Sequence, residues 1–104
     1  MLKTEVKILR GTLFTWDDDK NKANIRKHGV SFNEALTVFT DDNALFAPDE
    51  KHSDHEERFI IVGLSQNLRL LVVCHCYRES ETIIRLISAR KATNKESELY
   101  GGVR

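Results

Sequence analysis

Two segments in the second half of the chain decide the fold: Arg69-Leu-Leu-Val-Val-Cys-His-Cys-Tyr-Arg78 and Thr82-Ile-Ile-Arg-Leu-Ile-Ser-Ala-Arg-Lys91. Both are apolar, rich in β-branched residues and bounded by polar turn residues, which is typical of strands. A third apolar segment, Phe59-Ile-Ile-Val-Gly-Leu64, precedes them. Together they predict an antiparallel meander with strands at residues 57–65, 68–78 and 82–90. His, Arg and Lys side chains stand in and beside these strands, which indicates a sheet that binds an anion.

The first half of the chain predicts helices and short strands. Asp17 caps a helix that ends at His28, before Gly29. Capping boxes at Ser31–Glu34 and Thr93–Glu96 start two further helices. The remaining predicted bounds are a strand at 11–16, the second helix at 32–39, a strand at 44–47 before Pro48, and a last helix ending at Tyr100. The predicted order is β-α-α-β-β-β-β-α, which is an α+β fold.

Length and composition predict one small domain of 104 residues. Residues 1–11 either extend the first strand or form a loose N-terminal extension. The chain shows neither a signal peptide nor an apolar run that could span a membrane. Cys74 and Cys76 lie at positions i and i+2 of a predicted strand, too far apart for a disulfide, so we expect reduced thiols. These observations predict a cytoplasmic protein.

Charge is balanced overall but not along the chain. The formal net charge is +0, which argues against a protein coated in positive charge for nucleic-acid binding. Residues 1–57 contain 8 Lys and Arg against 12 Asp and Glu, whereas residues 58–104 contain 8 against 4. The formal net charge is therefore −4 for the first half and +4 for the second half. A polyanion should bind the second half.

Turn positions allow the register of the meander to be predicted. If Gln66 and Asn67 form a two-residue turn, Arg58 lies opposite His75. If residues 79–81 form the next loop, His75 lies opposite Arg85. Arg58, His75 and Arg85 would then form one row across the sheet, with Tyr77 two residues along. The alternative is that both arginines make ordinary ion pairs with Glu56, Glu57 or Glu79, and that His75 only packs in the sheet.

Such a row suits phosphodiester chemistry. Guanidinium groups bind phosphate oxygens bidentately and stabilise a pentavalent transition state, and histidine transfers protons near neutral pH. RNA needs no metal for this reaction because its 2′-hydroxyl is the nucleophile, and the sequence offers no spaced set of metal ligands. His52 and His55 lie in a polar loop, where they are either solvated or catalytic.

Four motifs occur in order along the chain: Phe14-x-Trp16-Asp17, Asn24-x-x-Lys27-His28-Gly29-Val30-Ser31-Phe32-x-Glu34-Ala35, His52-Ser53-x-x-Glu56-Glu57-Arg58-Phe59 and Ile87-Ser88-Ala89-Arg90-Lys91-Ala92-Thr93-x-x-Glu96-x-x-x-Tyr100. Together they resemble the BrnT family, the ribonuclease toxins of type II toxin-antitoxin systems. The resemblance covers residues 14–100.

The resemblance implies a RelE-like fold, metal-independent RNA cleavage without a cofactor, and inhibition of translation. It also implies a hetero-oligomer with a BrnA-like ribbon-helix-helix antitoxin, through which the complex binds operator DNA, and no membrane partner. The positions that the motifs carry over are His52, Glu57, Arg58, His75, Arg85, Arg90 and Lys91.

From their chemistry we assign roles to these residues. Arg58, Arg85 and Arg90 hold and neutralise the phosphate, while His75 or Glu57 takes the 2′-hydroxyl proton. Arg90 is also assigned to RNA binding, together with Lys91, Arg78, Tyr77 and His52. The alternative function is a degenerate toxin that binds an antitoxin and co-represses transcription without cleaving RNA.

Overall fold

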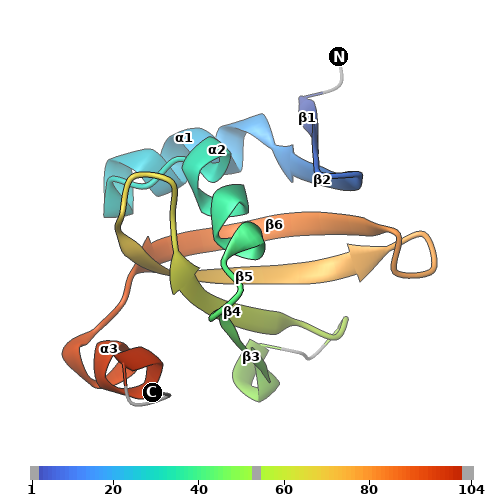
Figure 1. Ribbon diagram of the computed structural model, residues 1–104. Coiled ribbons are helices and arrows are strands. Elements are labelled where there is room, and N and C mark those ends of the chain that lie inside the picture. The colour runs from blue at the N-terminus through green and yellow to red at the C-terminus, as the bar shows by residue number, and fades with distance from the viewer. Residues whose placement is uncertain (1–2, 53–54, 102–104) are drawn as a thin grey trace.

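The computed structural model describes residues 3–52 and 55–101. Its centre is a six-stranded sheet of order β1-β2-β6-β5-β4-β3 (Figure 1). Neighbouring strands are antiparallel except β2 and β6, which are parallel. The strands are β1 (Thr4–Leu9), β2 (Thr12–Asp17), β3 (Leu45–Pro48), β4 (Phe59–Leu64), β5 (Leu70–Arg78) and β6 (Ile83–Lys91). The fold is α+β, as predicted from the sequence.

Helices lie on both sides of the sheet. The helices α1 (Asp18–His28) and α2 (Phe32–Ala35), with the 3-10 helix η1 (Leu36–Thr40), cover one side, here called the helix face (Figure 1). The helix α3 (Asn94–Gly101) packs at one end of the other side, the open face, and a short 3-10 helix, η2 (Glu50–His52), follows β3. No helix within the described residues has the length and apolar character needed to cross a membrane.

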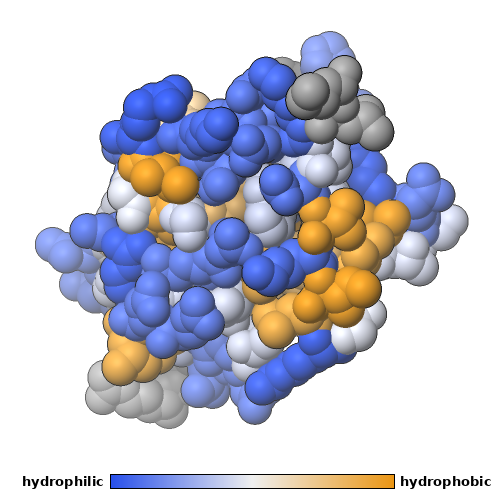
Figure 2. Space-filling view, turned by 90° about the horizontal axis from the view of Figure 1, so that it is seen from above, coloured by the Kyte–Doolittle hydropathy of each residue, from blue (hydrophilic) through white to orange (hydrophobic). Residues whose placement is uncertain are grey.

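The hydrophobic core lies between the sheet and the helix face. Its members include Phe14 and Trp16 of β2, Phe32 of α2, Leu71 of β5 and Leu86 of β6, all at most 2% exposed. Seen from the helix side, the surface is mostly hydrophilic, with an apolar area toward the right of the view (Figure 2). Burial of the apolar side chains of β2, β5 and β6 under α1 and α2 fixes which face of the sheet stays open.

The predicted helix ends are confirmed in detail. The side chain of Asp17 accepts hydrogen bonds from Asp19 N at 2.8 Å and Lys20 N at 3.2 Å, and Gly29 ends α1 with φ of 68°. At α3 both bonds of the capping box form, because Thr93 Oγ1 accepts from Glu96 N and Glu96 Oε1 accepts from Thr93 N. The start signals of both helices and the stop signal of α1 are thus confirmed, whereas α3 includes Gly101 and does not end at Tyr100 as predicted.

The second helix is shorter than predicted. Ser31 Oγ accepts from Glu34 N at 3.1 Å, so half of the expected capping box is present. The Glu34 carboxylate binds Arg69 and Ser65 across the molecule. After Ala35 the chain tightens into η1. The prediction of one α-helix over 32–39 was therefore wrong in its second half.

Residues 4–9 are not a loose extension. They form β1, which pairs antiparallel with β2 from Thr4 opposite Asp17 to Leu9 opposite Thr12. Arg10 and Gly11 connect the strands with φ of 50° and 81°. Positive φ at both central residues is the geometry of a two-residue hairpin turn whose twist matches that of the strands.

The predicted row across the meander is wrong because both hairpins are shifted by one residue. Phe59, not Arg58, lies opposite His75, and Leu86, not Arg85, lies opposite His75 on the other side. The first connection is not a two-residue turn. It spans residues 65–69 and is closed by hydrogen bonds from Ser65 N to Arg69 O and from Leu68 N to Ser65 O.

A bulge in β6 changes which arginines share a face. Cys74 lies opposite Ser88 and His75 opposite Leu86, which leaves Ile87 without a partner. Side chains alternate between faces along a regular strand, so Arg85 and Arg90 would point to opposite faces. The extra residue restores both to the open face.

Leu68 offers a test of the first connection. It adopts φ of 61°, a left-handed conformation that destabilises the folded state for a residue other than glycine. Because the side chain is 78% exposed, its burial does little to offset this cost. We expect Leu68→Gly to raise the free energy of unfolding by about 0.5–1 kcal/mol. Urea denaturation measures the change, with Leu68→Ala as the control that retains the strain. A glycine variant no more stable than the alanine variant would contradict this account.

Candidate functional site

A hollow on the open face gathers five acidic or basic side chains, and three of them, His52, Arg58 and Arg90, belong to the motifs. Its volume is about 620 Å³. We call it the open-face hollow, and its lining consists of Asp49, Lys51, His52, Arg58, Ile60, Val72, Cys74, Ile87, Ser88 and Arg90. Two parts of the chain supply its charged groups: the segment from Asp49 to Arg58, which contains η2 and leads into β4, and the end of β6 with Arg90.

The loop after β3 positions the first group of residues. Pro48 is the last residue of β3, and Asp49 N donates to Arg58 O at 2.8 Å, which ties the start of the loop to the start of β4. His52 N donates to Asp49 O at 3.2 Å and closes the turn of η2. Asp49, His52 and Arg58 are thereby held around one rim of the hollow.

Asp49 orients His52. The Nδ1 atom of His52 lies 3.1 Å and 3.0 Å from the two carboxylate oxygens of Asp49. A carboxylate at Nδ1 favours the tautomer with a proton on that nitrogen, which leaves Nε2 as the basic atom. The His52 side chain is 64% exposed, so Nε2 is accessible to a bound substrate. The sequence signal for this pair was an acidic residue three positions before a histidine in a tight turn; Asp49 was not among the predicted site residues.

Arg90, at the end of β6, also lines the hollow and is held by α3. Its guanidinium donates to both oxygens of Glu96, at 2.7 Å and 2.8 Å. The hydrogen bonds from Arg90 lower the pKa of Glu96 to about 2 and raise that of Arg90. Glu96 also completes the capping box of α3, so one carboxylate fixes both the helix and the arginine.

Arg58 is partly buried and interacts with acidic residues. Glu56 lies between two arginines, 4.0 Å from Arg58 Nε and 3.1 Å from Arg78 Nη2. The expected alternative of ordinary ion pairs is therefore met in part. Arg58 nevertheless lines the hollow together with Arg90, and guanidinium groups in one cavity suit the binding of an anion.

His75 does not belong to this site. It is fully buried on the helix face, where its ring contacts those of Phe39, Phe46, Phe59 and Tyr77 at centroid distances of 4.9–6.5 Å. Its Nδ1 lies 3.2 Å from Val73 O, and burial lowers its pKa. A neutral, enclosed imidazole on the far side of the sheet is poorly placed to exchange protons with a substrate in the hollow.

The other predicted residues fall into two groups. Arg85 and Arg78 face the open side beside Cys76, beyond the residues that line the hollow. Tyr77 lies on the helix face next to His75, and Lys91 points away from Arg90 by strand alternation. Glu57 is exposed in the segment that leads into β4. The structure therefore places Arg58, Arg90 and His52 in the lining of the hollow, whereas the other predicted site residues lie outside that lining.

Cys74 forms part of the floor of the hollow. It is 8% exposed, and its Sγ lies 3.6 Å from Asp49 Oδ2. Burial, followed by the charge of Asp49, raises the pKa of the thiol to about 11, so it stays protonated at neutral pH. Both cysteines are free. Across the described residues, no group of three or more His, Cys, Asp or Glu side chains is placed to hold a metal ion.

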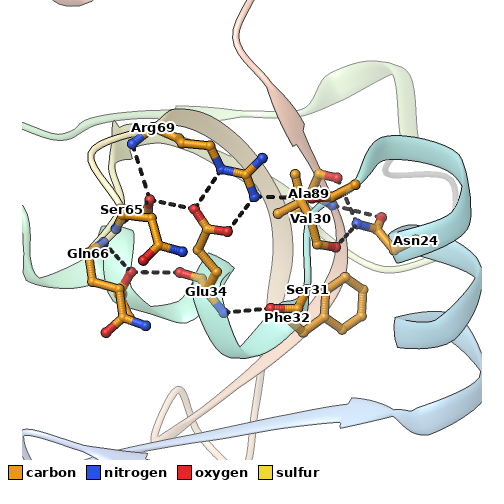
Figure 3. Close-up of polar contacts among 12 residues, drawn as sticks. Asn24, Val30, Ser31, Phe32, Glu34, Ser65, Gln66, Arg69 and Ala89 are labelled. Carbon is orange, nitrogen blue, oxygen red and sulfur yellow. Dashed lines mark hydrogen bonds and ion pairs between the residues drawn. The ribbon is translucent and has the colours of Figure 1, made fainter.

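A second polar cluster, which the sequence did not reveal, supports the sheet from the helix side (Figure 3). Glu34 is buried and accepts from Arg69 Nε at 2.9 Å and from Ser65 Oγ at 2.6 Å. The bonds from Arg69 lower the pKa of Glu34 to about 2 despite burial. Beside it, Asn24 of α1 donates to Val30 O and Ala89 O and accepts from Ala89 N. These contacts fix α1 and α2 on the sheet.

Comparison with known proteins assigns the chain to a protein family. The family model described as "Ribonuclease toxin, BrnT, of type II toxin-antitoxin system" matches residues 16–96. The chain belongs to the BrnT family. A crystal structure of the Brucella abortus ribonuclease toxin BrnT is similar, with 25% sequence identity and a TM-score of 0.59 over 76% of this chain and 94% of that one. Comparison with curated protein sequences gave no match.

The BrnT match includes all residues of the open-face hollow. It excludes β1 and most of β2. The resemblance read from the four motifs is thus confirmed, as are the ribonuclease toxin family and the type II toxin-antitoxin class.

Proposed function

We propose that this BrnT family member is a metal-independent endoribonuclease that inhibits translation and that cleaves RNA at the open-face hollow. The observation that carries the proposal is the geometry of the hollow. Its lining includes Arg58, Arg90 and Lys51 together with the hydrogen-bonded Asp49–His52 pair. This combination offers phosphate binding and proton transfer within one cavity.

The chemistry divides between these side chains. His52 Nε2 accepts the proton of the RNA 2′-hydroxyl, and the oxygen then attacks the adjacent phosphorus. The P–O bond to the 5′-oxygen breaks, and this oxygen takes a proton from solvent to become the 5′-hydroxyl. Asp49 holds His52 by Nδ1 and stabilises the imidazolium that forms. Arg58 and Lys51 stabilise the added negative charge of the pentavalent phosphorus. Arg90, whose direction Glu96 fixes, orients the strand.

An antitoxin of the BrnA type would neutralise the enzyme by covering the same face. The cationic lining of the hollow favours a partner that brings carboxylates or an apolar segment to it. Operator DNA would then be bound through the antitoxin, in a hetero-oligomer with the toxin.

The proposal predicts that cleavage needs no divalent cation. Because the 2′-hydroxyl is the nucleophile and arginines supply the charge, purified protein should cut RNA at the same rate in EDTA as in magnesium. Induced expression without antitoxin should also arrest growth and degrade RNA. Loss of cleavage in EDTA with recovery in magnesium would exclude the mechanism. Intact RNA under all conditions would favour a binding module.

Proton transfer by His52 gives a second prediction. His52→Ala should lower the cleavage rate by about a hundredfold, within the range for loss of a general base. His55→Ala is the matched control, because it removes an exposed histidine of the same loop and should change the rate less than about tenfold. Single-turnover rates on a defined RNA measure both variants. Equal losses would show that the loop contributes only charge.

A further inference from the structure

Among residues 3–52 and 55–101, no strand pairs with the outer edge of β1. In the sheet order β1 pairs with β2 only, and Figure 1 shows β1 at the end of the described structure. Val6 is 58% exposed and Ile8 is 69% exposed. An exposed edge strand with apolar side chains tends to pair with a strand of another chain. The strand also lies before residue 16, where the family match begins. It lies outside the family match, and none of its residues lines the open-face hollow.

The hydrogen bonding of β1 shows which backbone groups point outward. Lys3 O accepts from Asp18 N at 2.7 Å, so the residues of odd number direct their N–H and C=O groups toward β2. Thr4, Val6 and Ile8 consequently direct theirs to the free edge. An antiparallel strand added there must pair through these residues.

Charge then selects one register for pairing with a second copy. When Val6 lies opposite Val6 of the second copy, each Glu5 lies opposite a Lys7, in the closely spaced pairs that do not exchange hydrogen bonds. A shift by two residues in either direction places Glu5 opposite Glu5 or Lys7 opposite Lys7. Among these three registers, only the one centred on Val6 places opposite charges face to face within β1.

We infer that β1 is a homodimerisation edge. Two copies pair antiparallel through β1 about a two-fold axis at Val6, which joins their sheets into one. The contact buries Val6 and Ile8 on the open side and places the Glu5–Lys7 pairs on the helix side. A strand of six residues buries a small area, so the dimer forms at micromolar or higher protein concentration. This inference does not depend on ribonuclease activity.

Charge reversal tests the register directly. In Lys7→Glu each Glu5 faces a glutamate, and in Glu5→Lys each Lys7 faces a lysine, so each variant alone should self-associate at least about tenfold more weakly than the wild type. An equimolar mixture of the two should form a heterodimer, because every facing pair is then of opposite charge. The double variant should dimerise like the wild type. Sedimentation velocity of the full chain over a concentration series measures all four samples.

The inference would be overturned by a wild type that stays monomeric throughout the series. It would equally be overturned by single variants that associate as well as the wild type, which would place a dimer contact elsewhere. Failure of the mixture to form heterodimers would also exclude this register. Circular dichroism of each variant confirms that these exposed substitutions leave the fold intact.

Discussion

Replacing Arg58 by Ala is expected to lower the rate of RNA cleavage by at least about a hundredfold, the loss typical when a group that stabilises transition-state charge is removed. Arg58 lines the hollow with Arg90, and its backbone oxygen accepts a hydrogen bond from Asp49 N. Arg58→Lys should recover only a small part of the rate, because lysine lacks the planar fork that binds two phosphate oxygens. Cleavage of a short labelled RNA at saturating enzyme measures the chemical step.

Arg85→Ala is the matched control for Arg58. Both residues are cations of the open face, but Arg85 lies beside Cys76, beyond the lining of the hollow. We expect a loss smaller than about tenfold, mainly through weaker RNA binding, because an exposed cation contributes long-range attraction. A larger loss from Arg85→Ala than from Arg58→Ala would move the site away from the hollow.

Glu34→Ala is expected to have the largest effect on stability, lowering the free energy of unfolding by about 3 kcal/mol. Glu34 is 5% exposed, and its removal leaves the Arg69 guanidinium and the Ser65 hydroxyl without their shared acceptor. The control is Glu98→Ala, which replaces an exposed glutamate of α3 and should change stability by less than about 0.5 kcal/mol. Urea unfolding measures both. Equal stability of the two variants would contradict the role given to the cluster.

The same carboxylate predicts the direction of acid sensitivity. The Arg69 contact lowers the pKa of Glu34 from 4.5 to about 2, so the unfolded chain takes up a proton at higher pH than the folded one. The stabilisation is complete above pH 4.5 and is lost as the pH falls toward 2. Glu34→Gln should remove this part of the pH dependence. An unchanged slope in that variant would assign the acid sensitivity to other groups, such as Glu96.

Elements with local signals were predictable from sequence. The Asp17 cap, Gly29 and the Thr93–Glu96 box act within one turn of chain, and each fixed a helix end correctly. The strands of the meander were also recognised, because their apolar runs exceed the surrounding segments in length. The pairing registers of these strands were predicted wrongly, because register depends on the conformation of the loop that joins each pair of strands. Leu68 in a left-handed conformation and the bulge at Ile87 have no signature that distinguishes them from a regular hairpin.

The site was predicted in part for the same reason. Arg58, Arg90 and His52 were named from motifs and meet at the hollow. His75 was misplaced because a shift of one residue in each hairpin separates it from both arginines. Asp49 was missed because its contact with His52 depends on the turn after Pro48, and Glu34 because its partner Arg69 is remote in sequence.

The ends of the RNA products test the central claim most directly. Attack by the 2′-hydroxyl at the open-face hollow leaves a 2′,3′-cyclic phosphate on one fragment and a 5′-hydroxyl on the other. Mass spectrometry of the fragments from a defined RNA, cut by the wild type in EDTA, should show both ends, and an RNA with 2′-O-methyl groups throughout should stay intact. Fragments with 3′-hydroxyl and 5′-phosphate ends, or cleavage of the methylated RNA, would contradict it.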